Sequence, residues 1–328
     1  MRKTVALVLG SGGARGYAHI GVIEELTARG YDIACVAGCS MGAVIGGIYA
    51  AGKLDEYRQW TESLDYLDVL RLLDVSFRLG AIRGERVFGR IHQMLGDITI
   101  EQLPIPFTAV ATDLTNHQEI WFQEGCLHQA MRASAAIPSL FTPVVQGKRI
   151  LVDGGLLNPL PIVPVVSSHC DLIVAVNLNA TNHLHYSLPI IERPPAIRRR
   201  VEQLVSRLGQ RLPSWRRKND EALLLDEAMA PDETPPPTPT AAPKSASGSR
   251  LAELSGPASL LELINQSFEV MQTSLAQYKI AGYPPDVLIN VPKRVCRFFE
   301  FYKAPELIQL GRQIARDSLD RFEANQRG

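Results

Sequence analysis

Short apolar runs alternate with helical patterns through the first half of the chain. The runs are rich in Val, Ile, Leu and Ala, as buried strands are. Between the first two runs, Ile20, Ile23 and Leu26 recur at helical spacing. The pattern predicts strands at Val5–Leu9, Ile33–Ala37, Phe107–Thr112, Glu119–Phe122, Arg149–Val152 and Leu172–Asn177, and helices at Gly16–Arg29 and Met41–Ala51. Such alternation indicates an α/β fold with a largely parallel, buried sheet.

The pattern changes after about residue 190. Residues 181–212 contain a basic amphipathic segment, in which Ile197, Val201 and Leu204 begin an apolar stripe among many arginines. Residues 213–256 are rich in Pro, Ala, Ser and Gly, a composition that cannot bury enough apolar surface to order itself, so we predict a flexible insertion. Residues 257–328 return to helical spacing, with one strand at Val287–Ile289, and are expected to complete the domain that residues 5–180 begin.

Composition and charge narrow the class of protein. The formal net charge is zero, from 34 basic and 34 acidic residues, so nucleic acid is not an expected partner. The five cysteines have no CxxC spacing, which favours a reducing compartment over a disulfide or zinc framework. The first apolar run is too short for a signal peptide, and no stretch approaches the length of a transmembrane helix. The sequence predicts a cytoplasmic protein.

A Gly-Cys-Ser-Met-Gly segment follows the second predicted strand directly. G-x-S-x-G between a strand and a helix is typical of a nucleophile elbow. Gly38 and Gly42 would remove the bulk that such a sharp turn excludes, and Ser40 would lie at the N-terminus of the next helix, whose dipole favours developing negative charge. Cys39 is the stronger intrinsic nucleophile, but its side chain should point away from the apex. The alternative is an ordinary strand–turn–helix junction that contains a serine.

Two further motifs carry candidate chemistry. Gly10–Gly16 reads Gly-Ser-Gly-Gly-Ala-Arg-Gly after the first strand, and its glycines let N–H groups converge on a phosphate or an oxyanion. A dinucleotide site is disfavoured because Arg15 stands where G-x-G-x-x-G needs its third glycine. Asp153 ends a predicted strand, where α/β enzymes place catalytic groups, although an Asp-Gly turn is a common alternative.

Taken in this order, the three motifs resemble those of the patatin-like phospholipase family, most closely its bacterial RssA-like members. The resemblance covers Val5 to about Asn177, including the blocks 133–138 and 158–161, and is expected to resume over Leu260–Phe322. It implies a three-layer sandwich, with helices on both sides of a largely parallel sheet. One departure is Ser11, where many members of the family have glycine.

The resemblance also implies a Ser–Asp dyad that hydrolyses lipid or other acyl esters through an acyl-enzyme, with no cofactor and no metal. Ser40 would be the nucleophile and Asp153 the base, within a proton-acceptor motif that includes Gly154 and Gly155. The expected oxyanion donors are the N–H groups of Gly12, Gly13 and Ala14, with Arg15 assisting. A free aspartate, with a pKa of about 3.9, is a weak base toward serine, so the site must raise that pKa.

The histidines have no recognisable triad context. His19 is expected to pack or cap a helix, and His128 and His169 fall in predicted helices.

Other functions remain open at this point. The long insertion is compatible with a regulatory or scaffolding protein that acts through a partner, and the same motifs could serve a soluble carboxylesterase or thioesterase. The basic segment could bind an anionic membrane peripherally, as basic amphipathic helices do, or pack its apolar stripe on the core.

Overall fold

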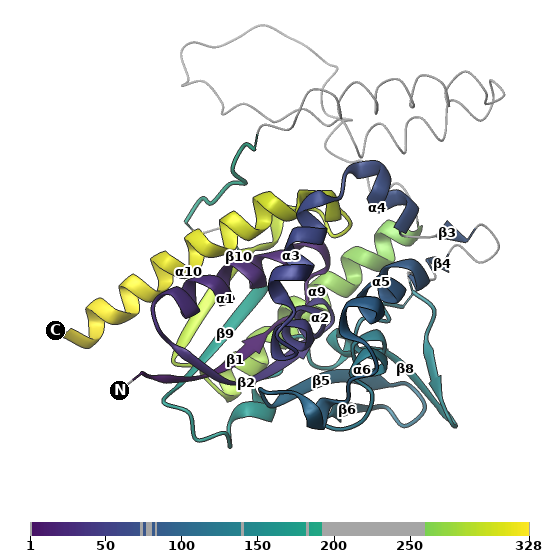
Figure 1. Ribbon diagram of the computed structural model, residues 1–328, viewed down its shortest axis with the longest axis horizontal. Helices are drawn as coiled ribbons and strands as arrows, with labels where there is room; N and C mark the ends of the chain where they lie inside the picture. The colour runs from purple at the N-terminus through teal and green to yellow at the C-terminus, as the bar shows by residue number, and fades with distance from the viewer. Residues whose placement is uncertain are drawn as a thin grey trace, which may run out of the picture. The chain divides into compact units, whose positions relative to one another are not determined.

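The computed structural model describes residues 2–72, 75–76, 81–82, 84–138, 141–181, 184–191 and 260–327. Its central element is a sheet of eight strands (Figure 1). Followed from one hydrogen-bonded neighbour to the next, the strands are β10 (Val287–Pro292), β9 (Leu172–Ala180), β1 (Thr4–Leu9), β2 (Asp32–Cys39), β5 (Phe107–Asp113), β8 (Arg149–Asp153) and β7 (Val144–Gln146), with β6 (Gln118–Phe122) also paired to β5. The first five run parallel, whereas β6 and β8 run antiparallel to β5, and β7 antiparallel to β8.

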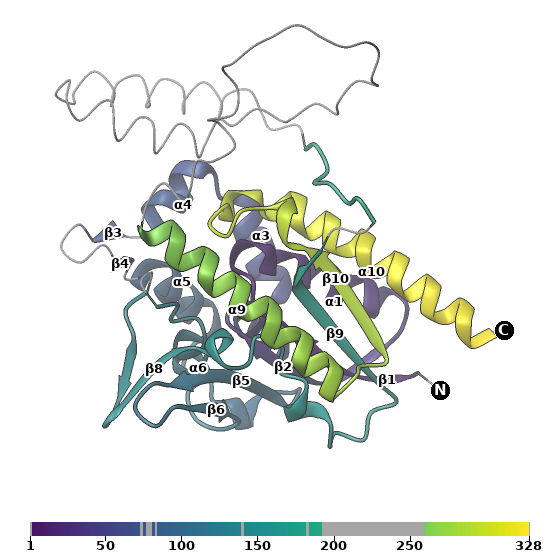
Figure 2. The ribbon, with the colours of Figure 1, turned by 180° about the vertical axis from the view of Figure 1, so that it is seen from behind.

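Helices cover both faces of this sheet. The α-helices are α1 (Ala18–Ala28), α2 (Met41–Ala50), α3 (Leu54–Ser63), α4 (Tyr66–Leu72), α5 (Glu85–Leu95), α6 (Leu127–Ser134), α9 (Leu260–Gly282) and α10 (Ala304–Arg327). Short 3₁₀ helices lie at Gly13–Tyr17, Ile100–Gln102, Gly154–Leu156, Val163–Val165, Lys293–Val295 and Phe301–Lys303, and β3 (Val75–Ser76) pairs with β4 (Ala81–Ile82). Figure 1 shows α1, α2 and α10 in front of the sheet, and Figure 2, seen from behind, shows α9 across the opposite face.

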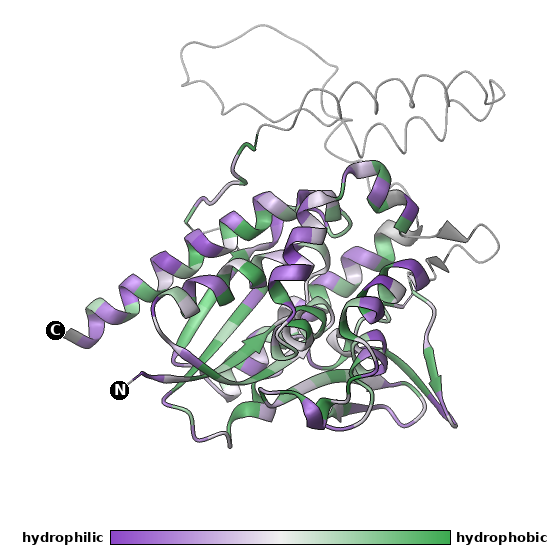
Figure 3. Ribbon diagram, in the orientation of Figure 1, coloured by the Kyte–Doolittle hydropathy of each residue, from purple (hydrophilic) through white to green (hydrophobic). Residues whose placement is uncertain are grey.

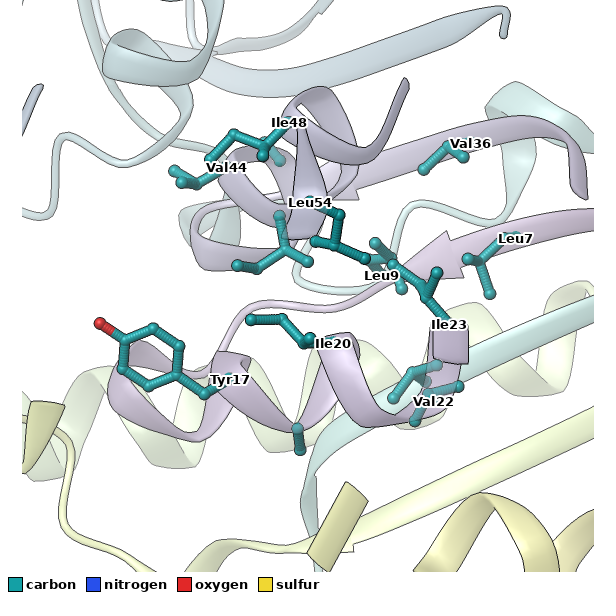
Figure 4. Packing of buried hydrophobic residues seen from close by; sticks show 14 of the residues in the cluster. Leu7, Leu9, Tyr17, Ile20, Val22, Ile23, Val36, Val44, Ile48 and Leu54 are labelled. Carbon is teal, nitrogen blue, oxygen red and sulfur yellow. The ribbon is translucent and has the colours of Figure 1, made fainter. Parts of the chain in front are cut away.

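The core follows from the alternation of side chains along β1. Leu7 and Leu9 point to one face and pack with Ile20 and Ile23 of α1, as Figure 4 shows. The intervening Ala6 and Val8 point to the other face, in a smaller cluster with Ala276 of α9. The strands are largely hydrophobic along their length, as strands covered on both faces must be (Figure 3).

The predicted fold class is confirmed, and the strands predicted in the first half of the chain are present. The helix expected from Gly16 to Arg29 begins earlier, as a 3₁₀ turn at Gly13–Tyr17 that continues into α1. The expectation for His169 was wrong: it lies outside the helices, with a φ of 54°.

Some expectations concern other parts of the chain. Most of the basic segment 181–212 and the whole insertion 213–256 lie outside the described residues, so the flexible insertion and the peripheral membrane contact stay predictions. Within the described ranges, no helix combines the length and apolar character needed to cross a membrane.

Candidate active site

Strand β5 brings Ser40 and Asp153 together. Two other strands, β2 and β8, pair with successive parts of the same edge of β5. β2 pairs with the first half of β5 as far as the partners Cys39 and Val110. β8 pairs with the second half, ending at the partners Asp153 and Ala111. β6 occupies the other edge of β5 at these residues, so β2 and β8 must share the first edge. The end of β2 therefore meets the end of β8, and Ser40, which follows Cys39, comes beside Asp153.

Ser40 has the strained geometry of a nucleophile elbow. Its φ is 55° and its ψ is −124°, which a residue with a side chain rarely adopts, and only 2% of its surface is exposed. A Cβ at Gly38 would collide with the carbonyl of Gly42, so the chain can turn this sharply only with glycine there. The Ser40 N–H donates to Ser134 Oγ at 2.9 Å, and that hydroxyl donates to the Val110 carbonyl at 2.6 Å. Ser134 therefore ties the elbow to β5.

Asp153 is fully buried at the end of β8. Its Oδ1 accepts the Gly155 N–H at 2.7 Å, and its own N–H donates to the Ala136 carbonyl at 2.8 Å. Its Oδ2 is buried without a well-formed hydrogen bond among the described residues. Burial raises the pKa of Asp153 to about 7, against the lowering effect of hydrogen bonding from the Ser40 side chain and Gly155. The site therefore supplies the raised pKa that a carboxylate base for serine needs.

Cys39, the residue before Ser40, is fully buried. Its Sγ lies 3.9 Å from Asp153 Oδ1. Burial, with the charges of Asp153 and Glu119, raises the pKa of the thiol well above its usual range. Cys39 therefore stays protonated at neutral pH, which makes it a poor nucleophile.

The glycine-rich loop presents two N–H groups with no hydrogen-bond acceptor among the described residues, those of Gly12 and Gly13. In each case the carbonyl of the same peptide unit accepts a hydrogen bond from a side chain. Asn179 Nδ2 donates to the Ser11 carbonyl at 3.0 Å, and Arg15 Nε donates to the Gly12 carbonyl at 3.2 Å. Because C=O and N–H of a trans peptide point in opposite directions, these bonds fix the direction of both N–H groups.

Two of the expected oxyanion groups are engaged elsewhere. The Ala14 N–H donates to the Phe298 carbonyl at 2.9 Å. Arg15 is 1% exposed, and its guanidinium also donates to the Lys293 carbonyl, Asn179 and Glu269. Both residues therefore anchor the loop in this structure. The N–H of Met41, in the first turn of α2, has no acceptor among the described residues and adds a donor that the sequence motifs did not single out.

An apolar cavity opens at Ser40. Ser40, Gly13 and Met41 contribute to its wall, and about half of the other lining residues come from α3, α4 and α5. The other lining residues are Tyr17, Val44, Tyr57, Trp60, Leu64, Val69, Leu72, Val87, Phe88, Ile91, Ala135, Ile137, Phe141 and Phe301. The hydroxyls of Tyr17 and Tyr57 hydrogen-bond each other, so these polar atoms are satisfied and the lining is apolar.

The histidines do not form a triad with Ser40 in the described part of the chain. His19 Nε2 bonds the Gly10 carbonyl at 2.9 Å, and burial lowers the pKa of His19 to about 4, so it is neutral at pH 7. His128 bonds the Phe88 carbonyl at 3.0 Å. The packing role expected for His19 fits this contact, which holds the start of the glycine-rich loop.

Comparisons with known proteins identify the family of this chain. Residues 7–166 match the family model described as patatin-like phospholipase. An uncharacterised NTE family protein of Mycobacterium bovis is 42% identical over 97% of this chain and 92% of its own length. The chain belongs to the patatin-like phospholipase family, within the group named for neuropathy target esterase (NTE). It is therefore an enzyme of the carboxylic ester hydrolase class.

Other relatives match part of the chain. An uncharacterised NTE family protein of Mycobacterium tuberculosis is 35% identical over 61% of this chain and 35% of its own length. Neuropathy target esterase sws of Drosophila grimshawi is 33% identical over 48% of this chain and 11% of its own length. Among solved structures, VipD from Legionella pneumophila aligns with a TM-score of 0.45 at 16% identity, over 98% of this chain and 67% of that one. The narrower resemblance to RssA-like proteins stays a prediction.

The sequence motifs did not identify the residues that support the catalytic pair. Ser134 and Ala136 lie in the block 133–138, which the family resemblance singled out without a role. Gln272, which contacts the glycine-rich loop from α9, lies 261 residues from its partner Ser11. A polar residue at a core-facing position of a helix was the signal that could have found it.

Proposed function

We propose that this protein hydrolyses acyl esters of lipids through an acyl-enzyme on Ser40, with Asp153 as the base. The observation that carries the proposal is the position of Ser40, in a strained elbow beside a buried carboxyl and on the wall of an apolar cavity. No histidine is required, because burial already brings the pKa of Asp153 close to neutral.

In the first half of the reaction, the Asp153 carboxylate takes the proton of the Ser40 hydroxyl while Oγ bonds the ester carbonyl carbon. The negative charge moves to the carbonyl oxygen, where the N–H groups of Gly12, Gly13 and Met41 can donate to it. Collapse of this intermediate breaks the ester bond, and the departing alcohol or lysolipid receives the proton from Asp153. The acyl group remains on Ser40.

In the second half, water gives a proton to Asp153 and its oxygen attacks the acyl-enzyme carbonyl. The same N–H groups hold the second oxyanion. When the bond to Ser40 breaks, the proton returns from Asp153 to Oγ and the fatty acid leaves. Asp153 therefore exchanges one proton in each half, which a group with a pKa near 7 does readily.

The cavity supports an acyl chain as the part of the substrate that is bound. Aromatic and aliphatic side chains such as Trp60, Phe88 and Ile91 line it, and they gain by removing methylene groups from water, at about 0.8 kcal/mol for each. We therefore expect kcat/KM to rise with acyl-chain length until the cavity is filled. A lining of this kind favours lipid esters over short soluble esters.

The test is active-site labelling with a fluorophosphonate probe, followed by hydrolysis of p-nitrophenyl esters of increasing chain length. Wild type should be labelled and should prefer medium or long chains, whereas Ser40→Ala should lose both labelling and turnover without unfolding. Cys39→Ser should keep its activity, because the buried thiol is protonated. Substantial turnover by Ser40→Ala, or inactivation by Cys39→Ser in a folded protein, would contradict the proposal.

A further inference from the structure

Helix α9 contacts the glycine-rich loop at two points. Gln272 Nε2 donates to Ser11 Oγ at 2.9 Å, and Glu269 Oε1 accepts from Arg15 Nη2 at 2.9 Å. The two helix residues are three positions apart, so they lie on the same side of α9. Ser11 and Arg15 bracket Gly12 and Gly13, whose N–H groups are the proposed oxyanion donors. One face of α9 therefore holds both ends of the oxyanion loop.

The contact at Gln272 is fully buried. Gln272 has no exposed surface and Ser11 only 1%. The Gln272 amide nitrogen also packs directly against Gly155, where a Cβ would collide with it. The same Cβ would lie 2.9 Å from Ser11 Oγ and 2.9 Å from Asp153 Oδ1. Gln272 therefore lies between the oxyanion loop and the turn that hydrogen-bonds the base.

The contact at Glu269 acts through Arg15. Arg15 Nε holds the Gly12 carbonyl, and that bond directs the Gly13 N–H. The ion pair with Glu269, whose side chain is 26% exposed, fixes the buried guanidinium in this orientation. Because a guanidinium is planar and rigid, a change at Nη2 is transmitted to Nε.

We infer that Gln272 and Glu269 are positioning residues for the hydrolysis, holding Gly12 and Gly13 where their N–H groups meet the oxyanion. The inference rests on the proposed function. It assigns part of the catalytic geometry to a helix that follows the segment Glu192–Leu260 in the chain and covers the opposite face of the sheet from the nucleophile helix α2 (Figure 2). Neither residue touches the substrate.

The first experiment compares Gln272→Leu with Gln277→Leu, the same change at an exposed position of the same helix. We measure kcat and KM on a soluble p-nitrophenyl ester, and the affinity for a trifluoromethyl ketone, whose hemiketal oxyanion uses the same donors. A misplacement of about 1 Å costs about 100-fold in rate, so Gln272→Leu should lower kcat by 10- to 100-fold with KM changed less than threefold. Ketone affinity should fall in parallel, and Gln277→Leu should match wild type.

Ser11→Ala removes the same hydrogen bond from the other side and introduces no unpaired polar group on the loop. It should lower kcat to a similar degree, and the double variant Ser11→Ala/Gln272→Leu should be no worse than either single change, because both remove one interaction. If Gln272→Leu fails to fold, the result for Ser11→Ala tests the positioning role of this hydrogen bond. Wild-type kcat and ketone affinity in folded Ser11→Ala would overturn the inference.

The ion pair has its own comparison. Glu269→Gln keeps an oxygen that accepts from Arg15 and should retain most of kcat, whereas Glu269→Leu should lose about tenfold or more. Equal kcat in the two variants would overturn the role of Glu269. Fluorophosphonate labelling of wild type and its loss in Ser40→Ala are measured alongside. If wild type is not labelled, or Ser40→Ala is still labelled, the proposed function is wrong. If labelling behaves as expected but the α9 variants keep the kcat of wild type, only this inference is wrong.

Discussion

At the scale of single residues, Asp153 shows how burial raises the pKa of a carboxyl group, as the proposed role of base requires. Its side chain has no contact with solvent, and desolvation outweighs the hydrogen bonds that stabilise its charged form, so its pKa rises to about 7. Near neutral pH the carboxyl then exists in comparable amounts with and without its proton. A surface aspartate, ionised above about pH 4, would be a much weaker base for the serine hydroxyl.

The pKa of Asp153 leads to a prediction about pH. Activity needs the ionised carboxylate, so kcat/KM should rise with pH and level off above about 7. Asp153→Asn should be inactive at every pH, because an amide cannot accept the Ser40 proton. The measurement is a pH–rate profile on a soluble ester between pH 5 and 9, roughly two pH values on either side of the expected midpoint. A flat profile in wild type would show that another group is the base.

Gly13 gives a second prediction at this scale. Its φ is +56°, and a Cβ there would lie 2.6 Å from the Phe298 carbonyl, so Gly13→Ala must shift the loop. We expect kcat to fall by about 100-fold or more, as for loss of one oxyanion donor.

Gly30→Ala is the matched control. Gly30 has a φ of +79° with nothing within 4 Å of the added Cβ, so it carries the same backbone strain without the collision. Normal turnover in Gly13→Ala would place the donors elsewhere.

At the scale of elements, the block at the end of α6 supports both members of the proposed catalytic pair, Ser40 and Asp153. Ser134 holds the Ser40 N–H, and the Ala136 carbonyl holds the Asp153 N–H. The backbone after β2 and the backbone at the end of β8 are therefore fixed by residues two apart in the sequence. This explains why the elbow can keep a strained conformation, since the surrounding hydrogen bonds determine it.

Ser134→Ala tests this support. The change leaves the buried Ser40 N–H and the Val110 carbonyl without their partner, and each unsatisfied group costs about 1–3 kcal/mol. We expect a lower thermal midpoint and a lower kcat, both measured on purified protein. Ser134→Thr keeps the hydroxyl and should recover part of the activity. A variant Ser134→Ala with normal stability and turnover would show that the elbow needs no such support.

The sequence predicted some of these elements well and others not at all. The strands β1 and β5, which flank the strand before Ser40, were predictable because buried parallel strands form runs of Val, Ile, Leu and Ala. The cavity was not, because Trp60 and Phe88 show the helical spacing of ordinary core residues, and spacing does not distinguish a filled core from a lined cavity. The role of α9 depends on contacts between distant parts of the chain, which no local pattern reveals.

At the scale of the whole molecule, the buried carboxylate lowers stability. The folded state binds a proton at Asp153 more tightly than the unfolded state, with a pKa of about 7 against 3.8. Between these values the folded state carries more protons, so this group makes the free energy of unfolding fall as pH rises. The full cost is present above about pH 7, with an upper bound of about 4 kcal/mol, and it vanishes below about pH 4.

Asp153→Asn should therefore be more stable than wild type at alkaline pH. Its amide oxygen can still accept the Gly155 N–H, and it carries no charge to desolvate. We expect a thermal midpoint several degrees higher at pH 8.5 and a smaller difference at pH 5, measured by calorimetry. An equal difference at both pH values would show that the ionisation of Asp153 does not contribute to stability.

The origin of the cavity walls has a consequence for how this enzyme can diversify. The largest group of lining side chains comes from α3, α4 and α5, which occupy one continuous stretch between α2 and β5. The proposed reacting groups, Ser40 and Asp153, lie outside this stretch, after β2 and at the end of β8, and both of these strands pair with β5. Exchanging the stretch Leu54–Leu95 between relatives could therefore transfer a preference for acyl length while the reacting groups stay in place. Evolution can therefore change the substrate preference of such an enzyme while its catalytic residues stay the same.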